Sequence, residues 1–211
     1  WDKALADVPT PLLFGIDSVD TKGITPEMHR QAYYGAWAFT ISNVLPPMPE
    51  NDSAHSQTPT GKPSLWAEGA SKARASAAWE SFFAQQILSI VDPETAWDAF
   101  EGIMMQVDAS GWLNGECLPS RKAQTAWVLY QHEPDRKRLA KVYEPIKGFL
   151  LWREKDPRWI FRDHDIADEK DSSFVDSLLV DLGFASQIAQ EIGRTEDLAM
   201  WARVRKRVIQ N

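Results

Sequence analysis

The chain has 211 residues, 44% of them hydrophobic, and a formal net charge of −7. This hydrophobic fraction is enough for a buried core, and the length fits one large domain or two small ones. The acidic balance argues against a nucleic-acid partner, because phosphates require a basic protein face. The longest apolar runs are too short for a membrane span, so we expect no membrane partner either.

Cys117 is the only cysteine, which excludes an internal disulfide. A single thiol fits a reducing compartment, and no signal-peptide pattern is present, so the sequence favours a cytoplasmic protein. No His or Asp pattern points to Cys117 as a nucleophile, and we interpret it as inert. Because the chain starts at Trp1 rather than Met, we expect the sequence to be part of a longer protein.

The pattern along the chain predicts helices throughout. Residues 1–25 read as an irregular segment, and Thr25-Pro26 then opens a helix to about Val44, where Pro46-Pro47 end it. After a long polar connection over 46–68, further helices are predicted over 70–91, 93–108, 120–132, 134–155, 172–192 and 194–207. No stretch alternates in polarity as a strand would. We therefore expect residues 26–211 to form one all-α domain of about seven helices.

The first polar cluster lies near the start of the helix predicted over 70–91. Lys72 and Arg74 precede the pair Trp79-Glu80. A ring can cover the apolar face of a sugar while a carboxylate and a guanidinium bond its hydroxyls. The alternative is a solvated helix end with Trp79 in the core.

The second cluster is a polar and aromatic loop, 111–119, that leads into a helix. Free N–H groups at a helix start, with amide and charged side chains beside them, suit a ligand with many hydroxyl groups. The alternative is a capping cluster with ordinary surface charges. The side chains concerned are Trp112, Glu116, Ser120, Arg121, Lys122 and Gln124.

The third cluster is a run of carboxylates from Asp163 to Asp171 at the start of a helix. Crowded like charges raise at least one pKa, which makes a general acid usable near neutral pH. A calcium loop is a weaker alternative, because the glycine expected at its sixth position is absent. A solvated N-cap at Asp171 is the third interpretation. The four His residues lack zinc-site spacing, and no nucleotide-binding glycine motif is present.

The order of these clusters resembles that in the (α/α)6-barrel glycosidases of the trehalase and processing α-glucosidase type, glycoside hydrolase families 37 and 63, which include bacterial mannosylglycerate and glucosylglycerate hydrolases. Arg74 followed by Trp79-Glu80-Ser81-Phe82 is similar to the family's basic residue and Trp-Asp-Ser/Thr-aromatic stretch. Lys122-Ala123-Gln124 stands where the family has Arg-Ser-Gln-Pro-Pro. Asp171-Ser172-Ser173 and Val180-Asp181-Leu182 are similar to its Asp-x-Ser and Val-Asp-Leu stretches.

The resemblance implies an (α/α) helical toroid that hydrolyses a small α-glycoside, such as an α-glucoside or a mannosyl- or glucosyl-glycerate, with inversion and without a metal or organic cofactor. Asp171 corresponds to the general acid, and Asp168 is its rival. The residues implied to hold the sugar or line the pocket mouth are Arg74, Trp79, Glu80, Gln124, Trp66, Trp112 and Glu116. A full barrel has about twelve helices and a Glu general base near its end. Because no segment here corresponds to that base, we expect an incomplete barrel, completed by a missing C-terminal half or by a second copy.

Two other function classes fit the pattern. A helical solenoid could bind a partner through its concave face, with the Trp residues as interface anchors. An (α/α) lyase or epimerase would need a Tyr or His base, for which Tyr33 or Tyr34 is a candidate.

Overall fold

The computed structural model describes residues 5, 7–15, 23–47, 54–58, 78–113, 119–155 and 172–210. These residues form α-helices and short 3-10 helices, and their only β pairing is an isolated bridge between Leu45 and Gln57. The predicted all-α class is therefore confirmed. No helix in the described ranges is both long enough and apolar enough to cross a membrane.

The helices follow the predicted order, with ends that differ by a few residues. The α-helices are α1 (Pro26–Ser42), α2 (Ala78–Leu88), α3 (Pro93–Met104), α4 (Lys122–His132), α5 (Arg136–Lys155), α6 (Ser172–Ile192) and α7 (Leu198–Gln210). A 3-10 helix, η1 (Pro11–Phe14), lies within the segment predicted to be irregular, and η4 (Thr195–Asp197) leads into α7. Residues 70–77, where the second helix was expected to begin, lie outside the described ranges.

Local capping explains why several ends were predictable. The Thr25 side chain accepts a hydrogen bond from the Met28 N–H (3.2 Å), and Asp92 accepts one from the Thr95 N–H (3.1 Å). Each cap is followed by a proline at the first helical position. The backbone N–H at this position would have no acceptor within the helix, so proline, which lacks an N–H, loses nothing there. Gly193 ends α6 with φ of +82°, a conformation that glycine adopts without strain.

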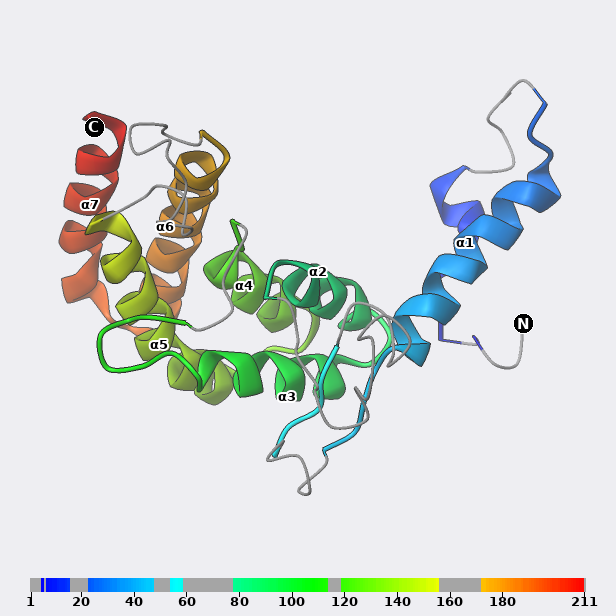
Figure 1. Cartoon of the computed structure of the whole chain (residues 1–211), viewed down its shortest axis with the longest axis horizontal. Helices are drawn as coiled ribbons and strands as arrows, with labels where there is room; N and C mark the ends of the chain where they lie inside the picture. The colour runs from blue at the N-terminus through cyan, green and yellow to red at the C-terminus, as the bar shows by residue number, and fades with distance from the viewer. Residues whose placement is uncertain are drawn as a thin grey trace, which may run out of the picture.

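Six of the helices form two layers (Figure 1). Helices α2, α4 and α6 lie side by side, and we call them the inner layer; α3, α5 and α7 pack on one side of it. The inner helices are parallel. The Gln86 amide donates to the Thr125 hydroxyl (2.8 Å) near the start of α4, and Ser89, just past α2, bonds His132 (2.7 Å) at its end.

The α4 and α6 helices run parallel in the same way. Asp181 contacts the first turn of α4, and Tyr130 near its end donates to Glu191 near the end of α6 (2.7 Å). Because all three inner helices are parallel, their N-terminal ends point to the same end of the layer.

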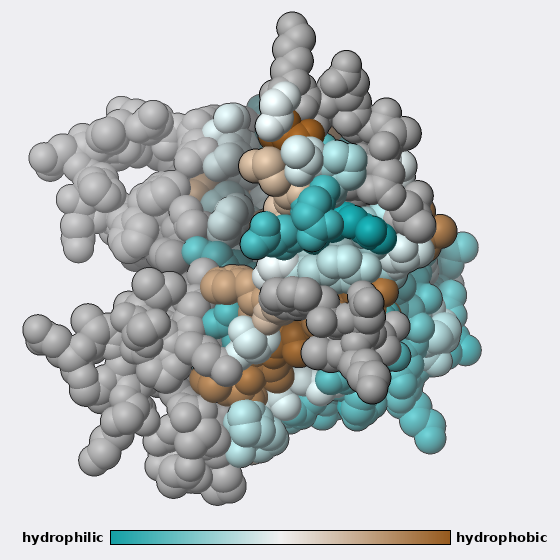
Figure 2. All heavy atoms as spheres, turned by 90° about the vertical axis from the view of Figure 1, so that its right-hand side faces the viewer, coloured by the Kyte–Doolittle hydropathy of each residue, from teal (hydrophilic) through white to brown (hydrophobic). Residues whose placement is uncertain are grey.

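Helix α1 lies apart from the two layers and packs against α2. Its Trp37 forms a small core with Leu5 and Val8, against which Val91 packs. In Figure 1, α1 extends away from the bundle at the end opposite α7. Figure 2 views the molecule from this side and shows two hydrophobic patches separated by a band of hydrophilic residues. Met28 and Phe39 on α1 are more than half exposed.

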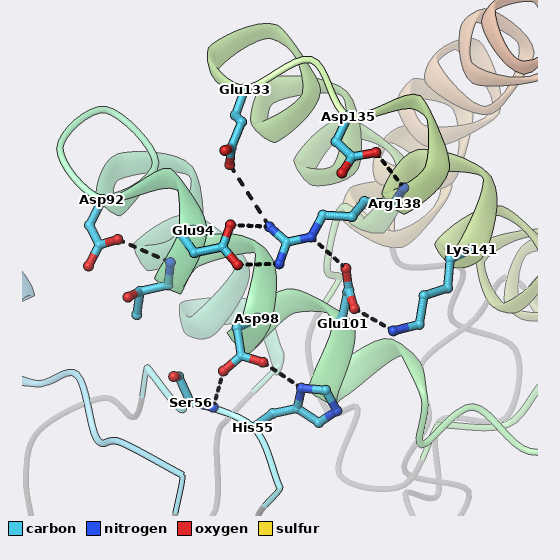
Figure 3. A network of polar contacts seen from close by, with 11 residues as sticks. His55, Ser56, Asp92, Glu94, Asp98, Glu101, Glu133, Asp135, Arg138 and Lys141 are labelled. Atoms are coloured by element: carbon cyan, nitrogen blue, oxygen red, sulfur yellow. Dashed lines mark hydrogen bonds and ion pairs between the residues drawn. The ribbon is translucent and has the colours of Figure 1, made fainter.

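A polar network fastens α3 to α5 and to the segment 54–58 (Figure 3). Arg138 on α5 donates two hydrogen bonds to Glu94 and forms an ion pair with Glu101, which also accepts from Lys141 (2.5 Å). Between Glu94 and Glu101 on the same stripe of α3, Asp98 bonds the His55 ring and accepts from the Ser56 N–H, both at 2.7 Å. Bidentate Arg–carboxylate pairs constrain geometry, so the network fixes how α3 lies against its neighbours.

The turn after α3 requires a glycine. Gly111 has φ of +90°, and a Cβ there would lie 2.3 Å from the carbonyl oxygen of Gly148 on α5. The backbone conformation and the close approach both exclude a side chain. The turn therefore presses directly against α5.

We expect Gly111→Ala to lower the free energy of unfolding by about 2 kcal/mol or more, because the added methyl group must displace backbone. Gly183→Ala, within α6 where a Cβ would meet nothing within 4 Å, is the matched control. It should raise stability by about 0.5–1 kcal/mol through helix propensity. Urea denaturation of both variants checks this, and equal effects would contradict it.

Candidate functional site

The start of α4 is buried, and a carboxylate from another helix caps it. Asp181 on α6 accepts hydrogen bonds from the N–H groups of Lys122 (2.7 Å) and Gln124 (2.9 Å). Arg121, the residue at the N-cap position, forms no side-chain cap. The first N–H groups of a helix have no partner within it and carry partial positive charge, so a carboxylate satisfies them and interacts favourably with the helix dipole.

Burial raises the pKa of Asp181 to about 6. The N–H bonds from α4 and the positive charge of Lys122 act in the opposite direction and favour the ionised form. The group thus titrates close to neutral pH because desolvation outweighs these favourable contacts.

Lys122 is a buried cation beside this cap. Its side chain is fully buried, and its Nζ donates to the Ser120 hydroxyl (2.5 Å). The same ammonium lies 3.4 Å from the ring centroid of Phe149 and 5.3 Å from that of Phe82. Aromatic faces attract cations, most strongly away from water. The interpretation of Lys122 as an ordinary surface charge is therefore wrong: packing between α2, α4 and α5 encloses it.

Arg153 on α5 is a second buried cation at this end of the molecule. Its guanidinium carbon lies 4.4 Å from the centroid of Phe174 and 5.8 Å from that of Trp152. A cavity of about 10 Å³, room for roughly one water, lies between α5 and α6. It is lined by Pro119, Ser120, Phe149, Leu150, Arg153, Phe174, Ser177, Leu178 and Asp181.

Trp112 is held at the same end by its own turn and by α5. Asp108 accepts hydrogen bonds from the Ser110 hydroxyl (2.6 Å) and the Trp112 N–H (3.0 Å), and these bonds lower the pKa of Asp108. The half-buried Trp112 ring packs edge-on against Trp152 at 4.9 Å between centroids. Trp152 is the neighbour of Arg153, which lines the cavity between α5 and α6, so Trp112 lies near that cavity.

Gln124 and Trp79 come from two adjacent inner helices. The Gln124 amide oxygen accepts a hydrogen bond from Arg121 Nη1 (3.2 Å). Trp79, in the first turn of α2, is 37% exposed and packs edge-on against Phe83 at 5.1 Å. Glu80 has one buried carboxylate oxygen that accepts no hydrogen bond from the described residues. Because Phe82 faces Lys122, the first turn of α2 lies level with the residues that precede α4.

Four of the nine expected site residues are therefore described, and all four lie at the N-terminal end of the inner layer. These are Trp79, Glu80, Trp112 and Gln124. The other five, Trp66, Arg74, Glu116, Asp168 and Asp171, lie outside the described residues. Among the residues that are described, no three His, Cys, Asp or Glu side chains gather as a metal site would require.

Sequence reasoning missed two members of this cluster. Arg153 and Trp152 drew no attention, because a basic residue near a helix C-terminus is usually a solvated partner of the dipole. Asp181 was noted only within Val180-Asp181-Leu182. Its position between Leu178 and Leu182, on the apolar side of α6, could have indicated a buried carboxylate.

The comparisons with known proteins identify no relative. No family model, curated protein or solved structure matches this chain.

The titration of Asp181 predicts how stability depends on pH. Its pKa is about 6 in the folded chain and about 4 when unfolded, so the folded chain binds more protons between these values. The free energy of unfolding should gain a contribution that is fully present below about pH 4 and lost as the pH rises through about 6.

We expect the wild-type protein to gain stability relative to Asp181→Asn as the pH falls from 7 to 5, because only the wild type takes up the proton. Thermal unfolding of both proteins at the two pH values measures this difference. A constant difference between them would show that Asp181 does not titrate in this range.

Proposed function

We propose that this chain forms part of an (α/α)-toroid glycoside hydrolase acting on a small α-glycoside by inversion. The observation that carries the proposal is that parallel inner helices gather Trp79, Glu80 and Gln124 at one end of the layer. Each of these residues belongs to a stretch that resembles the family, and Asp181 joins two such stretches by its bonds to α4.

The alternation of inner and outer helices also supports the proposal. Three hairpins, α2–α3, α4–α5 and α6–α7, each place one helix in the inner layer and one outside it. Continued around a ring, this repeat would make an (α/α) toroid, in which a site at the N-terminal ends of the inner helices would use their free N–H groups and dipoles.

The mechanism assigns one role to each residue. Asp171, just before α6, would donate a proton to the glycosidic oxygen as the leaving group departs, while a distant base activates water on the opposite face of the sugar. Trp79 would cover the apolar sugar face, and Glu80 and Gln124 would bond its hydroxyls. The general base would come from residues outside this chain or from a second copy.

A helical interaction module is the alternative that a specific observation favours. Large apolar side chains on α2 are substantially exposed, as expected for interface anchors. Tyr33, in contrast, donates its hydroxyl to the Pro9 carbonyl oxygen (2.7 Å), which gives no support to a lyase base there.

The test is hydrolysis of α-linked disaccharides and of mannosyl- and glucosyl-glycerate. The assay uses both this chain and the longest protein that contains it, and in whichever is active Asp171→Asn should reduce the rate by roughly 10²–10⁴, the usual contribution of a general acid. Gln124→Ala should weaken sugar binding, measured by a thermal shift, because it removes a hydrogen-bonding group from the site. Gln190→Ala, an exposed glutamine on α6, is the matched control and should leave both unchanged.

If the chain neither hydrolyses these glycosides nor shows a sugar-dependent thermal shift, the glycosidase proposal fails and the interaction module is favoured. Binding without hydrolysis, lost in Gln124→Ala, would support the sugar site and place the missing base outside the chain.

A further inference from the structure

The inner layer has one covered side and one open side. On α4, Lys122, Ala126 and Leu129 are fully buried and face the outer helices. On α2, Ser81 and Gln85 face the opposite way from the exposed residues, since they bond Thr58. At about 100° per residue, the side chains on the far side of each inner helix point away from the outer layer.

Large apolar side chains occupy the open side of α2. Trp79, Phe83 and Ile87 recur every four residues, with Ile90 just beyond, and they are 37%, 40%, 44% and 47% exposed. On α4, the side opposite the buried Lys122, Ala126 and Leu129 carries Trp127 and Gln131. The corresponding side of α6 presents Val180, Phe184 and Gln187.

Charge is placed at the ends of this surface rather than across it. Among the described residues, Glu80 and Asp176 lie near the N-terminal end, and Glu191 lies near the other end, where it accepts a bond from Tyr130. The middle consists of aliphatic, aromatic and neutral amide groups. The middle of this surface can therefore pack against a copy of itself without burying a charge, and the carboxylates lie at the rim, where water can solvate them.

The size of the surface is adequate for a stable interface. Helices of 11, 11 and 21 residues at 1.5 Å rise per residue and about 10 Å spacing cover on the order of 600 Å² in projection. Because side chains protrude from this plane, the solvent-accessible area of the surface is larger than its projection and comes near the ~800 Å² per partner of a standard interface.

We propose that a second copy of this chain covers the open side of the inner layer, with the same face of each copy packed against the other. The open face is defined by Phe83, Ile87 and Ile90 of the α2 region together with Val180 of α6, and Trp79, at its N-terminal edge, is left to the proposed sugar site. Helical arrays need polar outer faces to remain solvated, and this face lacks one. The inference does not depend on hydrolytic activity.

The test compares a substitution on the open face with the same substitution on the outer layer. Light scattering after size exclusion, at up to about 100 µM chain to detect micromolar affinity, should give twice the 23.9 kDa chain mass for the wild type. Ile87→Glu should give the single-chain mass. Ile209→Glu, at a site 58% exposed on α7, should leave the doubled mass unchanged. Circular dichroism establishes that both variants remain helical.

A wild-type protein at the single-chain mass throughout this range would overturn the proposal. So would a dimer that survives Ile87→Glu or dissociates with Ile209→Glu, or a series of larger assemblies without a defined dimer. A monomer that hydrolyses glycosides would refute only the dimer, and a dimer without sugar binding would refute only the glycosidase.

Discussion

The bond between Asp181 and the start of α4 is the contact on which the inner layer depends. One carboxylate accepts from two backbone N–H groups that would otherwise be buried without partners. Burying the charge is costly, and the nearby ammonium of Lys122 together with the N–H groups of α4 offsets only part of that cost. Because the acceptor lies midway along α6, the bond fixes the longitudinal position of α4 relative to α6.

That position determines which side chains meet at the N-terminal end of the layer. With α4 fixed, Gln124 stands in its first turn and Lys122 extends between Phe149 and Phe82. The end of α5 that carries Phe149 also carries Trp152, against which Trp112 packs. A single buried carboxylate thus helps to place residues from separate parts of the sequence at one end of the bundle.

Helix ends that are capped by nearby residues could be predicted from the sequence. Ends that are capped by a residue far along the chain could not. Thr25 and Asp92 cap their own helices three residues on, so the sequence carries the whole interaction. The start of α4 was expected at Ser120 and lies at Lys122, because its cap comes from Asp181 on another helix. The burial of Lys122 was unpredictable for the same reason: its enclosing groups come from α2 and α5.

The end and the open side of the inner layer impose different requirements. At the end, Asp181 and Lys122 have hydrogen-bond partners within the bundle, and the partly exposed Gln124 and Trp79 are the proposed sugar contacts. Along the side, Phe83 and Ile87 are 40% and 44% exposed, and no helix of the described ranges packs on them as α3, α5 and α7 pack on the opposite side. A helix layer is stable in water when both faces are covered or one is polar. Covering the side with a second copy would therefore satisfy the layer without blocking its N-terminal end, so the two proposals concern separate surfaces of the same helices.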